Sequence, residues 1–301
     1  MDKNLPISWE LYRSFLEVIR AGSLSAAGRR LGLTQPTISR HIAELEAALG
    51  AGPLFTRSPQ GLAPTEIARA IEEYAQTMES SASALIRTAS GAAEGIAGAV
   101  RIAASEVIGS EVLPALLRDL RVKHPALIFE VVLSNQSADL IRREADIAIR
   151  MVRPKQAALT AKKIGDVMLG VFAHPDYLAA HGRPKSVDEL KHHAIVGYDR
   201  DVGGAAVLGP MAKAFAPASF AYRTDNQVAQ LTAIRAGFGI GVCQVALARR
   251  EPRLTRLFTK EAAFPLETWI TMHEDLRASR RMRVVFDHLC EALAGYVREG
   301  R

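Results

Sequence analysis

A short polar stretch near the N-terminus carries side chains that could bind a nucleic acid. Its members are Thr34, Gln35, Pro36, Thr37, Ser39, Arg40 and His41. Amide and guanidinium groups can each form two hydrogen bonds with a base edge, and hydroxyl groups can bind phosphates. Gln35 could therefore pair with an adenine edge, and Arg40 could contact a guanine or a phosphate. On an isolated helix these hydroxyls could equally serve as caps or be solvated, so the surrounding elements decide.

The residues around this stretch predict three short helices. The first covers Ser8–Gly22, where a serine can cap the start and a glycine can end the helix. The second begins at Ser23 or Ser25 and reaches Leu31. The third covers residues 34–50, with a capping threonine, a proline in its first turn and apolar residues at helical spacing. Three short helices with a tight turn before the third match a helix-turn-helix.

Three arginines near these helices are candidates for phosphate contacts. Gly and Pro breakers around Ala51–Pro64 predict a two-stranded wing that carries Arg57. Arg29 and Arg30 lie at the end of the second helix. The alternative for each arginine is a solvated charge. The first 90 residues hold nine basic and nine acidic side chains, so contacts with phosphates must be few and localised.

A long helix is predicted from Glu66 to about Ser90, with Thr65 as its cap. Apolar side chains recur along one side of it: Ile67, Ile71, Tyr74, Met78, Leu85 and Ile86. A helix of this length cannot bury that stripe against a small head, and a second copy of the same helix is the simplest partner. The Gly/Ala-rich stretch Gly91–Ala99 then predicts a hinge.

Beyond the hinge, strands alternate with helices, as is typical of an α/β domain with two lobes. Strands are expected at 100–104, 127–133, 146–150, 161–164, 168–173, 194–198, 220–223, 240–242 and 268–272. Helices are expected at 111–123, 138–143, 175–180, 187–190, 226–236, 245–249 and 280–298. The predicted fold class is therefore α + α/β.

Polar side chains follow several of these strands, where ligands bind in α/β proteins. The candidates for contacts with a small-molecule effector are Ser105, Glu106, Asn135, Gln136, Arg150, Asn226 and Gln244. The alternative role is helix capping, which we expect of Ser137 and Asp225. Glu106 would repel an anionic effector, so either its side chain points away or the effector is not a simple anion. Arg150 could offset that charge or pair with an acidic neighbour.

Several classes of protein are disfavoured. The glycine run Gly237–Gly241 precedes a predicted strand, whereas a phosphate-binding loop follows one. His192-His193 and His288 lack metal-ligand spacing, and Cys243 and Cys290 provide neither a disulfide framework nor an evident redox pair. No nucleophile elbow or Walker loop is present. We therefore expect no catalytic residue, no metal and no cofactor.

Composition limits the remaining possibilities. With 301 residues, of which 49% are hydrophobic and 23% charged, the chain is expected to form two or three globular domains. No signal peptide and no apolar run long enough for a membrane span are visible, so the expected location is the cytoplasm. The formal net charge of +6 suggests a polyanionic partner.

The order and spacing of these motifs resemble those of LysR-type transcriptional regulators. The N-terminal motifs are Phe15-Leu16-Glu17-Val18, Gly22-Ser23-Leu24-Ser25-Ala26-Ala27, Leu31-Gly32-Leu33-Thr34-Gln35-Pro36-Thr37-Ile38-Ser39-Arg40-His41-Ile42, Leu45-Glu46, Leu49-Gly50, Leu54-Phe55-Thr56-Arg57, Gly61-Leu62 and Pro64-Thr65. The later motifs are His124-Pro125, Ala145-Asp146-Ile147-Ala148 and Ala236-Gly237-Phe238-Gly239-Ile240-Gly241. The resemblance covers essentially the whole chain.

This resemblance implies a winged helix-turn-helix in residues 1–64, a linker and dimerisation helix in 65–91, and an effector-binding domain in 92–301. That domain would have two Rossmann-like lobes similar to periplasmic solute-binding proteins. Lobe one would cover about 98–166 and 268–301, and lobe two about 167–267. The resemblance also implies a homodimer or homotetramer on double-stranded DNA. The effector would be small, often carboxylate-bearing, and held near Ser105 and Asn135.

Three hypotheses about function follow. The first is a sequence-specific, effector-responsive regulator of transcription. The second is an enzyme built on the α/β lobes, which the missing catalytic motifs disfavour. The third is a solute-binding module without a DNA function, which the complete N-terminal motif set disfavours.

Overall fold

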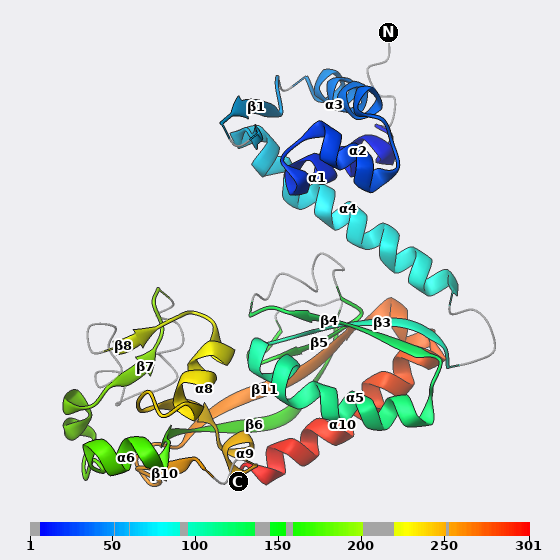
Figure 1. The fold of residues 1–301 in the computed structure, drawn as a ribbon. Coiled ribbons are helices and arrows are strands. Elements are labelled where there is room, and N and C mark those ends of the chain that lie inside the picture. The colour runs from blue at the N-terminus through cyan, green and yellow to red at the C-terminus, as the bar shows by residue number, and fades with distance from the viewer. Residues whose placement is uncertain are drawn as a thin grey trace. The chain divides into compact units, whose positions relative to one another are not determined.

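The chain divides into two compact units, residues 1–86 and 87–301. A computed structural model (Figure 1) describes residues 7–50, 52–59, 61–90, 96–135, 145–154, 159–200, 220–250 and 253–301. We call the two parts the N-terminal unit and the C-terminal unit and describe each by itself. Within the described ranges, no helix has the length and apolar content that a membrane span requires.

The N-terminal unit begins with three short helices at the predicted positions. They are α1 (Trp9–Ala21), α2 (Leu24–Leu31) and α3 (Gln35–Leu49). Each helix has a hydroxyl cap at its start and a glycine with positive φ at its end: Ser8 and Gly22, Ser23 and Gly32, Thr34 and Gly50. Of the two serines considered for α2, Ser23 is therefore the cap. The hydroxyl caps satisfy backbone N–H groups that the first turn leaves unpaired.

The wing packs against the end of α1. Strands β1 (Phe55–Ser58) and β2 (Gly61–Pro64) form the predicted antiparallel pair. The N–H of Leu62 donates to the carbonyl of Gly22 at 2.8 Å, so the wing and the α1–α2 turn are in direct contact. The core beneath them contains fully buried apolar side chains: Phe15, Leu16, Ile38, Leu45 and Leu54.

The long helix α4 (Glu66–Ser90) follows the wing, as predicted. The Thr65 hydroxyl caps it by accepting from the N–H of Ala68 at 3.3 Å. Ala68 and Ala75 are buried against the core of the N-terminal unit, and Arg20 of α1 binds Glu79 at 3.0 and 2.5 Å. These contacts fix one side of α4. Of its apolar stripe, Ile71 packs against the core, while Ile67, Tyr74, Met78, Leu85 and Ile86 are exposed.

In the described parts of the C-terminal unit, seven strands form the main sheet. Its strands are β3 (Gly98–Ala104), β4 (Leu127–Leu133), β5 (Ile147–Arg150), β6 (Leu159–Ala173), β9 (Gly241–Gln244), β10 (Thr255–Leu257) and β11 (Phe264–His273). The sheet order is β10-β6-β11-β5-β3-β4, and β9 also pairs with β6. A smaller parallel sheet contains β7 (Ile195–Gly197) and β8 (Phe220–Arg223).

Helices cover these sheets (Figure 1). The helices are the π-helical turn η1 (Ile108–Val112), α5 (Leu113–Lys123), α6 (Pro175–His181), the 3-10 helix η3 (Val187–His192), α8 (Gln227–Arg235), α9 (Val245–Arg249), the 3-10 helix η6 (Glu274–Ala278) and α10 (Arg280–Glu299). We call the part around β3, β4, β5, α5 and α10 lobe one, and the part around β7, β8, α6, α8 and α9 lobe two.

The long strands β6 and β11 contribute to the cores of both lobes. Val167 of β6 and Ile270 of β11 lie in the core of lobe one, while Val171 and Phe264 lie in a core of lobe two. The two strands pair antiparallel along their length, with a single shift of register at Thr268/Trp269. The lobes therefore share one continuous hydrogen-bonded ribbon.

Several predicted boundaries differ from the structure. The strands expected at 161–164 and 168–173 are one strand, because Gly165 adopts φ +148 opposite the register shift and lets the strand continue. The helix expected at 111–123 begins as a π-helical turn at 108, and β10 and η6 were not predicted. The helix expected at 138–143 lies outside the described residues.

The glycine run before β9 serves close packing. A Cβ at Gly239 would lie 2.3 Å from the carbonyl oxygen of Ala194, and one at Gly241 would lie 2.6 Å from a methyl of Ile234. Only glycine fits where backbone and side chains approach this closely. The glycine run therefore lets the chain at β9 pack closely against β7 and α8.

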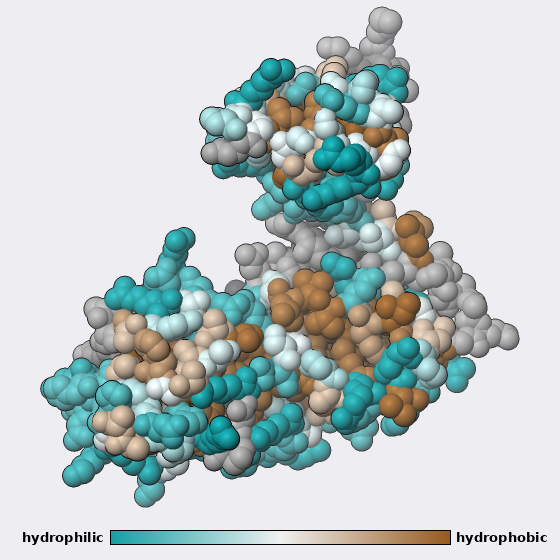
Figure 2. All heavy atoms as spheres, viewed as in Figure 1, coloured by the Kyte–Doolittle hydropathy of each residue, from teal (hydrophilic) through white to brown (hydrophobic). Residues whose placement is uncertain are grey.

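Strand β4 lies at one edge of the main sheet and exposes apolar side chains. Ile128, Val131 and Leu133 of β4 are exposed, as is Val122 at the end of α5. Figure 2 shows hydrophobic side chains gathered over this part of the C-terminal unit. Among the described strands β4 has a neighbour on one side only, and an edge strand with exposed apolar side chains favours association with another chain.

Candidate DNA-binding surface and interlobe site

Most side chains predicted to contact DNA are exposed on α2, α3 and the wing. The exposed members are Arg29, Arg30, Thr34, Gln35, Pro36, Ser39, Arg40 and Arg57. Thr37 is half-buried, and Ile38, Ile42 and Leu45 on the other side of α3 are buried in the core. Helix α3 is thus anchored by an apolar face and presents the polar residues of its first two turns to solvent.

Two hydrogen bonds orient the polar groups at the start of α3. The Ser25 hydroxyl donates to Gln35 Oε1 at 2.9 Å, and the hydroxyls of Thr34 and Thr37 lie 2.8 Å apart. The Gln35 oxygen keeps a second lone pair, and its NH2 group still carries donors for a base. Ser25 was considered in the sequence only as a cap, and its contact with Gln35 across the turn had no sequence signal.

The arginines of this surface form weak contacts with acidic neighbours. Arg30 binds Glu17 at 2.9 Å, and Arg40 lies 3.5 Å from Glu44 one turn along α3. The side chains of Arg30 and Arg40 are 59% and 68% exposed, although that of Glu17 is only 13% exposed, and ion pairs open to solvent are worth about 1 kcal/mol or less. A phosphate or a base edge can therefore compete for either guanidinium.

His41 differs from the other predicted contacts because it is bound inside the protein. Its Nδ1 lies 2.7 Å from the hydroxyl of Ser14, which is fully buried in α1. The ring is half-buried. His41 thus connects α3 to α1, in contrast to the exposed Arg40 beside it.

In the C-terminal unit, the side chain of Glu106 in lobe one contacts lobe two. Its Oε2 accepts a hydrogen bond from the backbone N–H of Gln227, the first residue of α8, at 2.8 Å. Its own N–H donates to Oδ1 of Asn135 at 3.3 Å, and Asn226 caps α8 through the N–H of Ala229 at 2.7 Å. Three predicted residues, Glu106, Asn135 and Asn226, therefore meet here, with Ser105 beside them in the sequence.

Three other predicted effector contacts are placed differently. Arg150 is buried, and its Nη1 donates to the carbonyls of Ser134 and Ile149 at 3.1 and 3.3 Å. Gln244 is buried and accepts from the Tyr296 hydroxyl at 2.6 Å, where burial raises the pKa of Tyr296. Gln136 lies outside the described residues.

A second contact joins the lobes at the other end of α8. Arg235 in the last turn of α8 donates to both carboxylate oxygens of Glu111 in η1, at 2.9 and 2.7 Å. The side chains are 28% and 21% exposed, so solvent screens this pair less than a surface pair. The hydrogen bonds from Arg235 lower the pKa of the Glu111 carboxyl. Sequence reasoning missed this pair because the two residues are 124 positions apart.

This pair predicts an acid-dependent loss of stability. A carboxyl with a lowered pKa stabilises the fold fully above its unfolded pKa of about 4.5, and the contribution is lost as the pH falls through the folded value. We expect the urea midpoint of the wild-type chain to fall more steeply between pH 5 and about 3 than that of a Glu111→Gln/Arg235→Gln variant. The exposed pair Arg118–Asp119 on α5 provides the control, since Arg118→Gln/Asp119→Asn should leave the slope unchanged. Equal slopes for the wild-type chain and the first variant would contradict this role.

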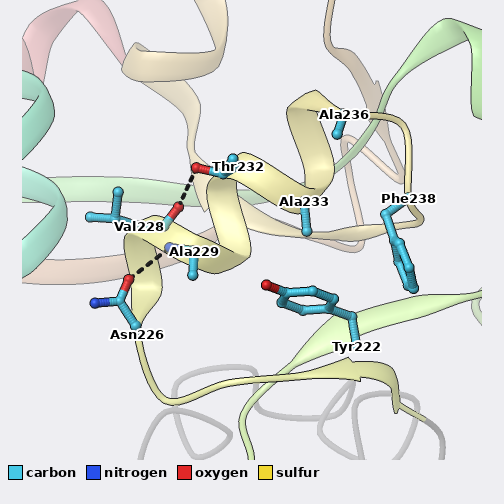
Figure 3. Close-up of a pocket in the computed structure, with 8 residues that line it drawn as sticks. All are labelled: Tyr222, Asn226, Val228, Ala229, Thr232, Ala233, Ala236 and Phe238. Atoms are coloured by element: carbon cyan, nitrogen blue, oxygen red, sulfur yellow. Dashed lines mark hydrogen bonds between the residues drawn. The ribbon is translucent and has the colours of Figure 1, made fainter.

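A pocket of about 480 Å³ lies beside α8. Its walls are formed by Tyr222, Asn226, Val228, Ala229, Thr232, Ala233, Ala236 and Phe238 (Figure 3). The rings of Tyr222 and Phe238 meet edge to face, with centroids 5.3 Å apart. The polar side chains of Asn226 and Thr232 are bonded to the α8 backbone, so the pocket offers mainly an apolar wall.

No cluster of His, Cys, Asp or Glu within the described residues could hold a metal ion. Cys243 and Cys290 are both buried and are not joined in a disulfide, and burial raises the pKa of Cys290 to about 11. A thiol with so high a pKa is a poor nucleophile at neutral pH.

The fold and these sites define a class of protein that combines a winged helix-turn-helix, a long helix and a two-lobed α/β unit. Residues 9–69 match the bacterial regulatory helix-turn-helix proteins of the LysR family, and residues 93–294 match the LysR substrate binding domain. The chain therefore belongs to the LysR family of transcriptional regulators.

Known relatives agree with this assignment. An HTH-type transcriptional regulator of Xanthomonas campestris pv. campestris is 33% identical over 183 residues, which are 60% of this chain and 52% of that protein. The regulator CrgA of Neisseria meningitidis is 30% identical over 190 residues, or 61% of each chain. The matched region thus spans about half to three fifths of these relatives. Both are named as regulators and not as enzymes.

Solved structures show the same architecture. CrgA, a LysR-type transcriptional regulator from Neisseria meningitidis, has a TM-score of 0.58 at 25% identity and covers 94% of this chain and 98% of that chain. Full-length CbnR complexed with its target DNA has a TM-score of 0.67 at 18% identity and covers 95% of this chain and 99% of that chain. The second likeness concerns the fold alone.

Proposed function

We propose that this chain is a DNA-binding regulator whose C-terminal unit responds to a small-molecule effector. The observation that carries the proposal is the build of α3, where Ile38, Ile42 and Leu45 are buried and the polar side chains of the first turns are exposed. A recognition helix needs one buried face and one exposed face. The buried face anchors the helix in the protein core, and the exposed face enters the major groove. In this proposal residues 1–64 bind DNA, 65–91 form the linker, and 92–301 bind the effector.

Each residue of the DNA-binding surface has a proposed role. Gln35 and Arg40 contact base edges, and the hydroxyls of Thr34, Thr37 and Ser39 bind phosphates near the free N–H groups of the α3 start. Further phosphate contacts come from the exposed arginines Arg29, Arg30 and Arg57. Pro36 fixes the first turn of α3. His41 positions α3 through its bond to Ser14.

A mobility-shift assay with DNA from the promoter region of the chain's own gene tests the proposal. We expect the full chain to retard this DNA and a variant that lacks residues 1–64 to lose the shift. The logarithm of the binding constant should fall with the logarithm of salt concentration, by about one unit for each phosphate contact. Retention of the shift without residues 1–64, or a slope near zero, would contradict direct DNA binding by this unit and would favour a solute-binding module or an enzyme.

We further propose that the chain acts as a homo-oligomer, either a dimer or a tetramer, joined by α4. Three apolar side chains of this helix are strongly exposed: Tyr74 by 75%, Leu85 by 69% and Ile86 by 67%. The spacing of Ile67, Ile71, Tyr74 and Met78 alternates between four and three residues, which places them on one side of the helix. The exposed apolar edge at β4 supports a second contact. The expected location of such a regulator is the cytoplasm.

A charged substitution in this stripe should disrupt assembly. We expect Leu85→Glu to lower the association constant at least 10-fold, because two carboxylates would be forced into an apolar interface. Sedimentation velocity across a dilution series measures this change. The control is Ser80→Glu, which adds the same charge about 140° around the helix from Leu85. An unchanged mass distribution for Leu85→Glu would contradict α4 pairing.

A further inference from the structure

Lobe one holds α8 of lobe two at both ends with acidic side chains. Glu106 accepts from the N–H of Gln227 at the start of α8, and Glu111 binds Arg235 in its last turn. Between these two contacts, Val107 packs against the apolar cluster that includes Leu231. A single segment of lobe one, residues 106–111, therefore contacts this nine-residue helix at its start and in its last turn.

Glu106 occupies a position that suits a small anion. The first N–H groups of a helix have no partner in the helix, and its dipole favours a negative charge at that end. Asn226 satisfies the N–H of Ala229, which leaves the N–H of Gln227 to a group from outside α8. The Glu106 carboxylate is that group, at 2.8 Å.

Hydrogen bonds hold the backbone of Glu106 in lobe one and order the polar groups around the start of α8 in lobe two. The Asn135 side chain after β4 accepts from the Glu106 backbone N–H at 3.3 Å. On the side of lobe two, Nε2 of Gln227 donates to the Tyr198 hydroxyl at 3.3 Å, and the Thr224 hydroxyl accepts from the N–H of Asn226 at 3.2 Å. The carboxylate thus enters a preformed polar setting.

We propose that Glu106 is an internal ligand of lobe two, which fills the carboxylate position at the start of α8 and holds the lobes together without an effector. A free carboxylate cannot take the Gln227 N–H while Glu106 is bound there, since two carboxylates about 4 Å apart repel each other. Glu106 therefore determines specificity, because it excludes small carboxylates from this position. The inference rests on the proposed effector role of the C-terminal unit.

Two experiments on the full chain test this inference. The first removes the Glu106 carboxylate by mutation, and the second supplies a free carboxylate, acetate, in its place. Hydrogen exchange measured by mass spectrometry reports on residues 222–232, which include the start of α8. In Glu106→Ala we expect this segment to exchange about tenfold faster than in the wild-type chain. Sodium acetate should slow exchange again in Glu106→Ala, because the free carboxylate replaces the missing one. Sodium chloride at the same concentration should not slow exchange in Glu106→Ala. Acetate should leave the exchange rate of the wild-type chain unchanged.

Two further variants separate charge from folding. Glu106→Gln keeps the size and an acceptor oxygen, so its exchange should be intermediate and insensitive to acetate. Glu274→Ala removes an exposed glutamate on η6 of the same unit and should behave as the wild-type chain. Unchanged exchange in Glu106→Ala, no response of that variant to acetate, or wild-type exchange in Glu106→Gln would each overturn the inference. None of these measurements involves DNA, so failure of operator binding would count against the proposed function alone.

Discussion

Replacement of Arg40 by alanine is expected to weaken binding to operator DNA by about 10- to 100-fold per contacted half-site, while the fold remains intact. Arg40 is exposed on the second turn of α3, and the contact it makes within the protein is the weak pair with Glu44 at 3.5 Å. An arginine that binds a base edge contributes about 1–3 kcal/mol of specific binding. Fluorescence anisotropy with specific and scrambled DNA of equal length measures the change.

The partner of Arg40 provides a matched control. Glu44→Ala releases the guanidinium and removes a negative charge near the DNA, so it should raise affinity for both DNA sequences. Arg40→Lys should retain affinity for scrambled DNA but lose specificity, because an ammonium cannot form the bidentate contact. Equal affinity of Arg40→Ala and the wild-type chain for the specific DNA would show that Arg40 contacts no base.

Replacement of Gly28 by alanine should remove operator binding almost completely. A Cβ at Gly28 would lie 2.7 Å from the carbonyl oxygen of Leu33, and the N–H of Leu33 donates to the carbonyl of Gly28 at 2.8 Å. The added methyl must therefore push the turn before α3 away from α2. We expect a loss of about 3 kcal/mol in the free energy of unfolding of the N-terminal unit, near the upper range for overpacking.

Gly32→Ala is the control, because it makes the same chemical change in the same turn. No atom lies within 4 Å of a Cβ at Gly32, whose φ is +68, so the cost should be only the left-handed strain of about 1 kcal/mol. Urea unfolding, monitored by Trp9 fluorescence, compares the stabilities of Gly28→Ala and Gly32→Ala. Both variants carry Trp269→Phe, because the chain has two tryptophans and the signal must come from the N-terminal unit alone. A Gly28→Ala variant as stable as Gly32→Ala would show that the α2–α3 turn tolerates the displacement.

The N-terminal unit could be predicted closely because its signals are local. Helix caps, terminal glycines and apolar spacing lie within a few residues of one another, and Ser8, Thr34 and Gly50 occupy the expected positions. The sequence left both Ser23 and Ser25 as possible caps of α2, and the structure shows that Ser23 caps the helix while Ser25 binds Gln35 of the next helix. The role of His41 was hidden for a similar reason, because its partner Ser14 lies 27 residues away.

The interlobe site could be predicted only in part. Polar residues after strands indicated the region of Glu106 and Asn135, since strand ends meet at one edge of a sheet. The same rule also selected Arg150 and Gln244, which are buried and form hydrogen bonds within the protein. The pair Glu111–Arg235 and the crossing of Glu106 to α8 depend on how the lobes pack, and such distant contacts leave no periodic pattern in a single sequence.

The shared ribbon of β6 and β11 has a mechanical consequence. Both strands run through the cores of the two lobes and are joined by backbone hydrogen bonds, with one irregularity at Thr268/Trp269. A change in the angle between the lobes must bend or twist both strands together, and the irregularity at Thr268/Trp269 is where their regular pairing is already interrupted. Ligand-driven motion in this unit should therefore be a limited bending or twisting of the ribbon near this irregularity, which carries a displacement near α8 into lobe one.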